Sequence, residues 1–442
     1  MANRQDLRPD NCPEWYDGKY VNEPGFCDEF LEEHPMLCIG GKLVGINGVI
    51  ESEAQVKQLI AEKLDPFLGS GLAKKCGSIL DYIKIRAHSE PLPLELDRIH
   101  FQNGVYRIGG EFEAKIEFCN NRLAISYDAD ARPPERWMKF LHELLDDEDI
   151  LTLQEFMGYC LIPSTKAQKM LVIIGKGGEG KSRIGLILMK LLGMSMNVGS
   201  IQKVETSAFA RADLQNKLLL VDDDMDMNAL PKTNYIKAIV TAEGRMDLER
   251  KGEQSYQARL YCRLMGFSNG SLNALYDQSD GFHRRQLILQ AKERPADRED
   301  DPYLVEKLEE ELPGIVLWCI EGLERLLRNN YRFTIGKRTR DNMKELRKSN
   351  DNVLEFMESD GYIAFDPGKT VSSKLLYDAY VLFCEDNAYK PYSATRLSQE
   401  MAQHAKRLGI EPTNNIHLPG GKRVRGFKGI EAIRGAYLPP IR

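Results

Sequence analysis

The sequence predicts an α/β protein built around a phosphate-binding loop, and three observations lead to this fold class. An apolar run at residues 171–174 leads directly into the segment GKGGEGKS at residues 175–182. Apolar residues then recur at helical spacing from Ile184 to Leu191. Further apolar runs alternate with helical segments as far as residue 294, which is the pattern of a sheet with covering helices.

Residues 175–182 match the P-loop pattern GxxxxGKS between a strand and a helix. Glycines let successive backbone N–H groups turn toward a phosphate, and the N-terminus of the helix adds partial positive charge. We expect Lys181 to reach the β- and γ-phosphates and Ser182 to ligate Mg²⁺. A glycine-rich loop without nucleotide is the alternative that this context disfavours. The predicted nucleotide-binding residues are Gly175, Lys176, Gly177, Gly178, Glu179, Gly180, Lys181 and Ser182.

An apolar run at residues 218–221 is followed directly by three aspartates, as in a Walker B element. Hydrolysis requires one carboxylate near the magnesium ion and a second to orient the attacking water. We assign Asp222 to the metal and Asp223 to the water, and Asp224 leaves the register open by one residue. An acidic turn after a buried strand is the alternative, and the P-loop upstream disfavours it.

Two further polar residues adjoin predicted strands. Asn269 follows the apolar run 264–267, where its amide could hold the same water. Arg285 comes directly before the run 286–289, and an arginine at such an edge can supply charge to a neighbouring subunit's nucleotide. A turn asparagine and a salt-bridged arginine are the alternatives.

A charged segment at residues 246–252 ends in a glycine turn. It could be a hairpin tip that carries Arg250 or Lys251 into a nucleic-acid channel. A solvated surface turn is the alternative.

The segments before the P-loop predict helices and short strands. Ser52 and Gln55 form a capping-box pattern before one helix, and Asn103-Gly104 marks a hairpin. Pro133-Pro134 opens a further helix. After the P-loop region, Pro313 should kink or divide the helical stretch 303–327.

The C-terminal part is basic although the whole chain carries a net charge of −6. Residues 337–442 carry 18 Lys or Arg and 13 Asp or Glu, so they have a net charge of +5. Residues 393–408 could be a capped recognition helix, and residues 417–429 a glycine-turned β-wing. The basic residues of this wing, which suit a phosphate backbone, are Lys422, Arg423, Arg425 and Lys428.

Composition argues against several other classes of protein. No window approaches the ~18 consecutive apolar residues of a membrane span, and the first residues lack the apolar core of a signal peptide. The nine cysteines are scattered without a CxxC pair, which predicts reduced thiols and not a zinc site. We therefore expect a cytoplasmic protein.

Taken together and in order, the motifs resemble superfamily 3 DNA helicases of the phage, plasmid and poxvirus primase-helicase type. The motifs are GKGGEGKS at 175–182, FARADLQNKLLLVDDD at 209–224, ERKG at 249–252, FSN at 267–269 and DGFHRR at 280–285. Segments at 127–131 and 153–159 are similar to the helical domain that precedes the ATPase in this family, and segments at 376–380 and 421–426 to its terminal winged helix. The segment before residue 150 is too short for a polymerase fold, so the expected protein is a helicase without a primase domain.

The resemblance implies an AAA+-like P-loop ATPase core with an N-terminal mostly helical domain and a C-terminal winged-helix domain. The expected divisions are an N-terminal extension at 1–50, a helical collar with short strands at 51–165, the ATPase at 166–335 and the winged helix at 336–442. It further implies a homo-hexamer that uses ATP and Mg²⁺ to translocate on single-stranded DNA and unwind forks, with Arg285 as an arginine finger and Lys251 on the DNA. Origin duplex DNA and a separate primase or initiator are possible partners. The alternatives are an origin-binding initiator with weak or no unwinding, and an ATPase that acts on another polymer.

Overall fold

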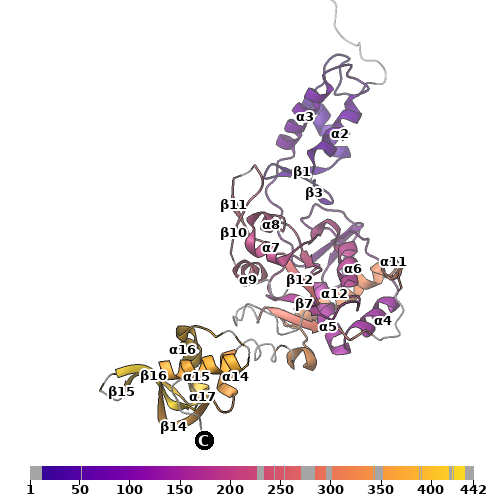
Figure 1. Ribbon diagram of the computed structural model, residues 1–442. Coiled ribbons are helices and arrows are strands. Elements are labelled where there is room, and N and C mark those ends of the chain that lie inside the picture. Colours follow the sequence, from indigo (N-terminus) through magenta and orange to yellow (C-terminus); the bar gives the residue numbers. More distant parts are fainter. Residues whose placement is uncertain are drawn as a thin grey trace, which may run out of the picture. The chain divides into compact units, whose positions relative to one another are not determined.

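The computed structural model describes residues 12–50, 52–225, 233–242, 244–252, 254–269, 284–294, 301–341, 343, 352–387, 389, 391–417, 421 and 423–433 (Figure 1). The chain forms two compact units, and among the described residues the first extends to Lys337 and the second begins at Arg338. No helix of the described ranges has the length and apolar character needed to cross a membrane.

A five-stranded parallel sheet forms the centre of the first unit (Figure 1). Its strands stand in the order β13-β7-β12-β9-β8. The apolar runs expected from the sequence form β7, β9, β12 and β13, whose side chains are almost entirely buried, whereas Val198 of the outer strand β8 is 59% exposed. The strand bounds are β7 Met170–Ile174, β8 Met196–Val198, β9 Leu219–Asp222, β12 Arg263–Ser268 and β13 Gln286–Gln290.

Helices follow most of these strands, as the alternating pattern predicts. Pro313 lies in the first turn of α12, so the expected helical stretch is divided into two helices. This is the position where a missing backbone N–H costs least. The elements are α6 Ser182–Leu192, the 3₁₀ turn η1 Gly193–Ser195, α7 Ile201–Thr206, α8 Ala208–Ala212, α9 Asn234–Thr241, α11 Leu304–Glu309 and α12 Leu312–Arg328.

Two helices before the P-loop, α4 Glu135–Leu144 and α5 Asp147–Tyr159, share one hydrophobic core with the sheet and α12. Glycines let α5 and α12 approach closely. A Cβ on Gly158 would lie 2.2 Å from the carbonyl oxygen of Cys319, and one on Gly322 would lie 2.4 Å from that of Gln154. The boundary expected at residue 165 therefore falls inside a continuous core.

A small antiparallel sheet of β4 Arg98–Phe101, β5 Gly104–Arg107 and β6 Glu111–Glu113 forms around the expected hairpin. The Asn-Gly pattern predicts a turn formed by Asn103 and Gly104. In the structure Phe101 pairs with Gly104, so Gln102 and Asn103 form the turn, one residue earlier. The side chain of Asn103 exchanges hydrogen bonds with the backbone of Tyr127, at 2.8 and 2.9 Å, and this fixes Asn103 within the turn.

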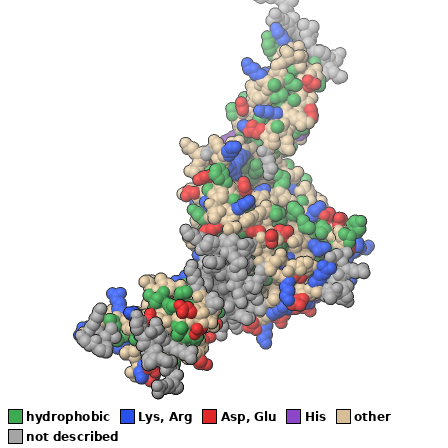
Figure 2. Space-filling view, viewed as in Figure 1, with side chains coloured by type: hydrophobic (Ala, Val, Ile, Leu, Met, Phe, Trp, Pro, Cys, Tyr) green, Lys and Arg blue, Asp and Glu red, His purple; other side chains and the backbone are tan. Residues whose placement is uncertain are grey.

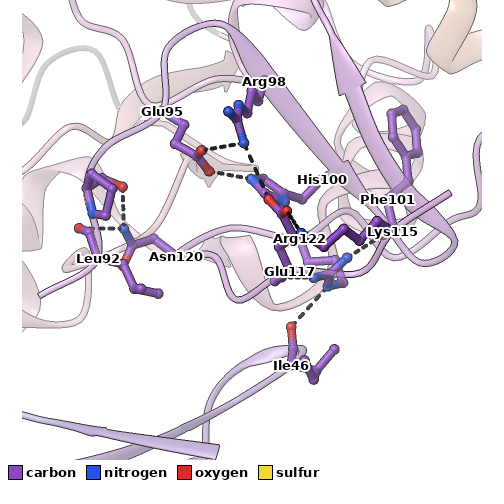
Figure 3. Close-up of polar contacts among 11 residues, drawn as sticks. Ile46, Leu92, Glu95, Arg98, His100, Phe101, Lys115, Glu117, Asn120 and Arg122 are labelled. Carbon is purple, nitrogen blue, oxygen red and sulfur yellow. Dashed lines mark hydrogen bonds and ion pairs between the residues drawn. The ribbon is translucent and has the colours of Figure 1, made fainter. Parts of the chain in front are cut away.

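Buried polar side chains connect this sheet to its surroundings (Figure 3). The guanidinium of Arg122, which is 4% exposed, donates to the carbonyl oxygens of Ile46, Phe101 and Glu117. His100 Nε2 lies 2.6 Å from Glu95 Oε2. Burial is the largest influence on His100 and lowers its pKa below the ordinary value, although Glu95 acts in the opposite direction.

The N-terminal residues form a core of their own that extends from Trp15 to Ala87. The expected boundary at residue 50 falls within this core, since α1 packs with the two helices that follow it. Ser52 caps α2 as predicted, and its hydroxyl accepts from the backbone N–H of Ala54. The elements are α1 Glu23–Glu33, β1 Met36–Ile39, β2 Lys42–Gly45, β3 Gly48–Val49, α2 Glu53–Leu64 and α3 Leu72–Arg86.

The second unit combines helices with a three-stranded antiparallel sheet in the order β14-β16-β15, around a separate hydrophobic core. Ser393 caps α16 as expected, and β15 and β16 form the hairpin expected near residue 420, with His417 opposite Arg423. The elements are α14 Asn352–Glu358, β14 Ile363–Ser372, α15 Ser373–Asp386, α16 Ala394–Gln403, α17 Ala405–Leu408, β15 Glu411–His417 and β16 Arg423–Ala432.

Candidate nucleotide-binding site

The loop between β7 and α6 has the backbone that its glycines allow. Gly177, Gly178 and Gly180 have φ angles of 103°, 82° and 100°, a region that other residues rarely adopt. The backbone N–H of Gly175 donates to the carbonyl of Ser268 at 3.0 Å, so the loop begins beside the end of β12. The loop therefore lies at the carboxyl edge of the sheet, where open α/β sheets bind their ligands.

Lys181 and Asn269, which the sequence assigned to one site, are in contact. Lys181 Nζ lies 3.1 Å from Asn269 Oδ1, although 88 residues separate them. The contact arises because β7 and β12 are neighbours in parallel register, with Ile174 opposite Ser268. Lys181 is 5% exposed, so its ammonium is held inside the site.

Glu179 is the site residue whose side-chain role the sequence did not indicate. Its carboxylate lies 2.8 Å from Lys181 Nζ and accepts hydrogen bonds from the backbone N–H groups of Lys176 and Gly177. The residue is 3% exposed. Burial, the largest influence, raises the pKa of Glu179, but the bonds from Lys181 and the backbone outweigh it and hold the pKa below its ordinary value.

Asp222 and Asp223 have different environments at the end of β9. Asp222 is buried, and its Oδ2 accepts from the backbone N–H of Ile201 at 2.8 Å, at the start of α7. Burial raises the pKa of Asp222 above its ordinary value. Asp223 is exposed. One oxygen of Asp222 thus anchors α7, and the assignment of metal and water ligands between these residues stays a prediction.

The residues present suit a nucleoside phosphate with Mg²⁺. The loop offers positive-φ glycines and a buried ammonium at the N-terminus of an 11-residue helix. A Cβ on Gly178 would lie 3.7 Å from Arg294 Nη1, so a second cation lies beside the loop. The hydroxyl of Ser182 and the carboxylates after β9 provide the oxygen ligands that magnesium prefers.

Arg285 lies at the amino end of the sheet's strands, whereas the P-loop lies at their carboxyl end. Its carbonyl accepts from the backbone N–H of Met170 at 2.8 Å, at the amino end of β7. The five residues of β7 separate the amino end of this strand from the loop. At 3.3 Å per residue this separation is ~16 Å. Arg285 therefore does not adjoin the P-loop of its own chain, and its expected role requires a neighbouring subunit.

The charged segment after α9 belongs to a hairpin of β10 Met246–Leu248 and β11 Tyr256–Ala258. Its two basic residues, Arg250 and Lys251, have different environments. Arg250 donates to Gln215 Oε1 at 2.9 Å, and its guanidinium lies 5.7 Å from the ring centre of Tyr256. Lys251 is exposed at the turn. Of this pair, Lys251 is therefore the more exposed side chain, and its contact with nucleic acid stays a prediction.

The second unit also presents basic side chains. Arg423 and Arg425 are both exposed on β16, two residues apart and so on one face of the strand, while Lys422 lies outside the described residues. The guanidinium of Arg396 stacks 3.8 Å from the ring centre of Tyr392. In the view of Figure 2, basic side chains on this unit are interspersed with acidic and hydrophobic ones. The basic residues are thus accessible but do not form an uninterrupted patch on that face.

Comparisons with known proteins match two parts of the chain to family models. Residues 173–285 match a family of unknown function, DUF5906, and residues 348–416 match the family described as poxvirus D5 protein-like. The second match supports a relationship with the poxvirus and phage primase-helicases that the motifs resemble. The narrower superfamily 3 assignment stays a prediction.

Solved structures share the fold of nearly the whole chain. Two apo structures of the NrS-1 C-terminal region superpose with TM-scores of 0.54 and 0.55, at 11% sequence identity. Each match covers 91% of this chain and 98% of the other. The mixed α/β architecture with its parallel five-stranded sheet is therefore shared, although only 11% of the residues are identical.

Proposed function

We propose that this protein is an ATP-dependent DNA helicase that serves the replication of a phage or other mobile element. The observation that carries the proposal is the meeting of Lys181 and Asn269 at the carboxyl edge of the sheet, 3.1 Å apart. These are the residues expected to bind the phosphates and to hold the attacking water. The strand order supports an AAA+-like core, since β12 stands between the strands of the P-loop and of Asp222.

Each site residue has a distinct task in this proposal. ATP with Mg²⁺ supplies the phosphoanhydride bond whose hydrolysis drives movement. Lys181 and the loop amides hold the phosphates, and Ser182 and Asp222 hold the metal ion. Asp223 and Asn269 orient the water, since both follow strands that end at the same edge. Positioning and charge stabilisation of this kind provide most of the catalysis in phosphoryl transfer.

As an arginine finger, Arg285 would act on a neighbouring subunit, because it lies directly before β13 and remote from the P-loop of its own chain. A homo-hexamer would bring Arg285 to the nucleotide of the next subunit. Lys251 at the hairpin turn would then contact single-stranded DNA. The winged helix proposed for residues 336–442 would add contacts through Arg423, Arg425 and Lys422.

An origin-binding initiator is the second candidate, and the separate core of the second unit favours it. Such a unit can bind duplex DNA independently of the ATPase unit. ATP would then control the assembly of the protein on DNA rather than unwinding. Strong preference for one duplex sequence, lost on removal of residues 338–442, would support this candidate.

The proposal is tested first by nucleotide binding and hydrolysis. Lys181→Ala should abolish ATP hydrolysis and weaken the binding of a fluorescent ATP analogue. Lys190→Ala is the matched control, because Lys190 lies on the helix that follows the loop, where its side chain is 48% exposed and pairs with Glu309. Equal losses in both variants, or hydrolysis that survives in Lys181→Ala, would contradict the assignment.

A further inference from the structure

The P-loop contains a single acidic residue, Glu179, whose side chain turns back into the loop. Its carboxylate accepts from the backbone N–H of Gly177 at 2.9 Å and from Lys181 Nζ at 2.8 Å. The backbone N–H of Lys176 donates to the same carboxylate. An anionic group of the protein therefore occupies donors of a loop whose expected ligand is itself an anion.

The two kinds of donor respond differently to charge. An amide N–H donates to any oxygen acceptor, whereas the ammonium of Lys181 is attracted mainly by negative charge, and charged hydrogen bonds are about twice as strong as neutral ones. A phosphate needs Lys181, but the amides of Lys176 and Gly177 lie at the beginning of the loop. The carboxylate of Glu179 can thus still accept hydrogen bonds from these two amides after its ion pair with Lys181 has broken.

We propose that Glu179 is a positioning residue that fixes the start of the P-loop and holds Lys181 until a nucleoside di- or triphosphate takes this lysine over. The inference rests on the proposed nucleotide site and specifies how the site is held before binding. Glu179 has two separable effects. Its oxygens order the loop through the amides, and its charge competes with the nucleotide for Lys181.

Glu179→Gln separates these effects, because the amide oxygen of glutamine still accepts from the backbone while the charge is absent. We expect this variant to bind a fluorescent ADP analogue about tenfold more tightly, which corresponds to ~1.4 kcal/mol. Glu293→Gln is the matched control. Glu293 pairs with Lys176 Nζ at 2.5 Å on the outside of the same loop and is 76% exposed, so the same change of charge there should leave the affinity nearly unaltered.

Hydrogen exchange of the nucleotide-free wild type gives a second test that requires no variant. The amides of Lys176 and Gly177 should be protected, should stay protected in Glu179→Gln and should lose protection in Glu179→Ala. Exchange of these amides at the rate of an unfolded chain in the wild type would overturn the proposal. Equal or weaker ADP binding by Glu179→Gln, or equal tightening by Glu293→Gln, would also overturn it.

The outcomes also distinguish this inference from the proposed function. If the wild type binds no ADP, or binds it no better than Lys181→Ala, the nucleotide site fails and the inference fails with it. If the wild type binds ADP and Lys181→Ala does not, while Glu179→Gln shows wild-type affinity, only the role of Glu179 is wrong.

Discussion

Removal of the P-loop lysine should destabilise the folded protein as well as weaken its nucleotide binding. Lys181 and Glu179 form an ion pair whose side chains are 6% and 3% exposed. Deleting one partner of a buried pair typically costs about 3–5 kcal/mol, because the other charge stays buried without compensation. The backbone N–H groups of Lys176 and Gly177 still donate to Glu179. We therefore expect a loss of about 3 kcal/mol for Lys181→Met, at the lower end of this range.

The double variant Glu179→Gln with Lys181→Met contains neither charge, so it should recover most of this loss, about 2 kcal/mol. It should still bind nucleotide more weakly than the wild type. A stability defect and a binding defect can thus be separated within one pair of residues, and loss of activity in a lysine variant alone does not show which of the two occurred.

Tryptophan fluorescence during urea unfolding can measure these free energies for the first unit. All three tryptophans of the chain precede residue 338, so the second unit contributes no signal. Trp137 and Trp318 lie in the core that contains the sheet, whereas Trp15 lies in the N-terminal core. The measurement is therefore made in a Trp15→Phe background. Wild-type stability in Lys181→Met, or a double variant less stable than the single one, would refute the reasoning.

Three other predictions concern more distant parts of the first unit. Arg285→Ala should bind ATP within about twofold of wild type but hydrolyse it at least ~100-fold more slowly, as expected for an arginine finger; full turnover would exclude this role. Lys251→Ala should lower the salt dependence of single-stranded DNA binding by about 0.7 in log–log slope per subunit. Arg250→Ala should leave this slope unchanged. Because Arg250 is bonded to Gln215, its replacement should instead increase hydrogen exchange in the hairpin. Burial holds the pKa of His100 in the folded protein below its unfolded value near 6.5. As the pH falls, His100 is therefore protonated in the unfolded state before it is protonated in the folded state. The free energy of unfolding then falls as the pH drops through about 6.5. His100→Gln should therefore show a smaller loss of unfolding free energy between pH 7.5 and 6, and an unchanged pH dependence would contradict this account.

Local patterns in the sequence predicted much of the fold and part of the site. The strand before the P-loop, the division of the helices at Pro313 and the cap of α16 by Ser393 depend on neighbouring residues, and each is found in the structure. The contact between Lys181 and Asn269 was also predictable, because the ends of neighbouring parallel strands meet at one edge.

Features that depend on distant partners could not be read from such patterns. Arg250 and Lys251 are adjacent in sequence, and only the position of Gln215, 35 residues earlier, separates their roles. Trp15 belongs to the same core as Ile60, so no local signal marks a boundary at residue 50. The inward turn of Glu179 follows from the left-handed glycines beside it, whose conformation a sequence pattern does not specify.

ATP-dependent separation of a forked DNA duplex tests the central claim most directly. Wild type, Lys181→Ala and Lys190→Ala are compared at one stated salt concentration, since binding to DNA depends steeply on salt. The account predicts that wild type and Lys190→Ala separate the strands and that Lys181→Ala does not. A wild-type protein that hydrolyses ATP but leaves the fork intact would contradict the helicase assignment and favour the initiator.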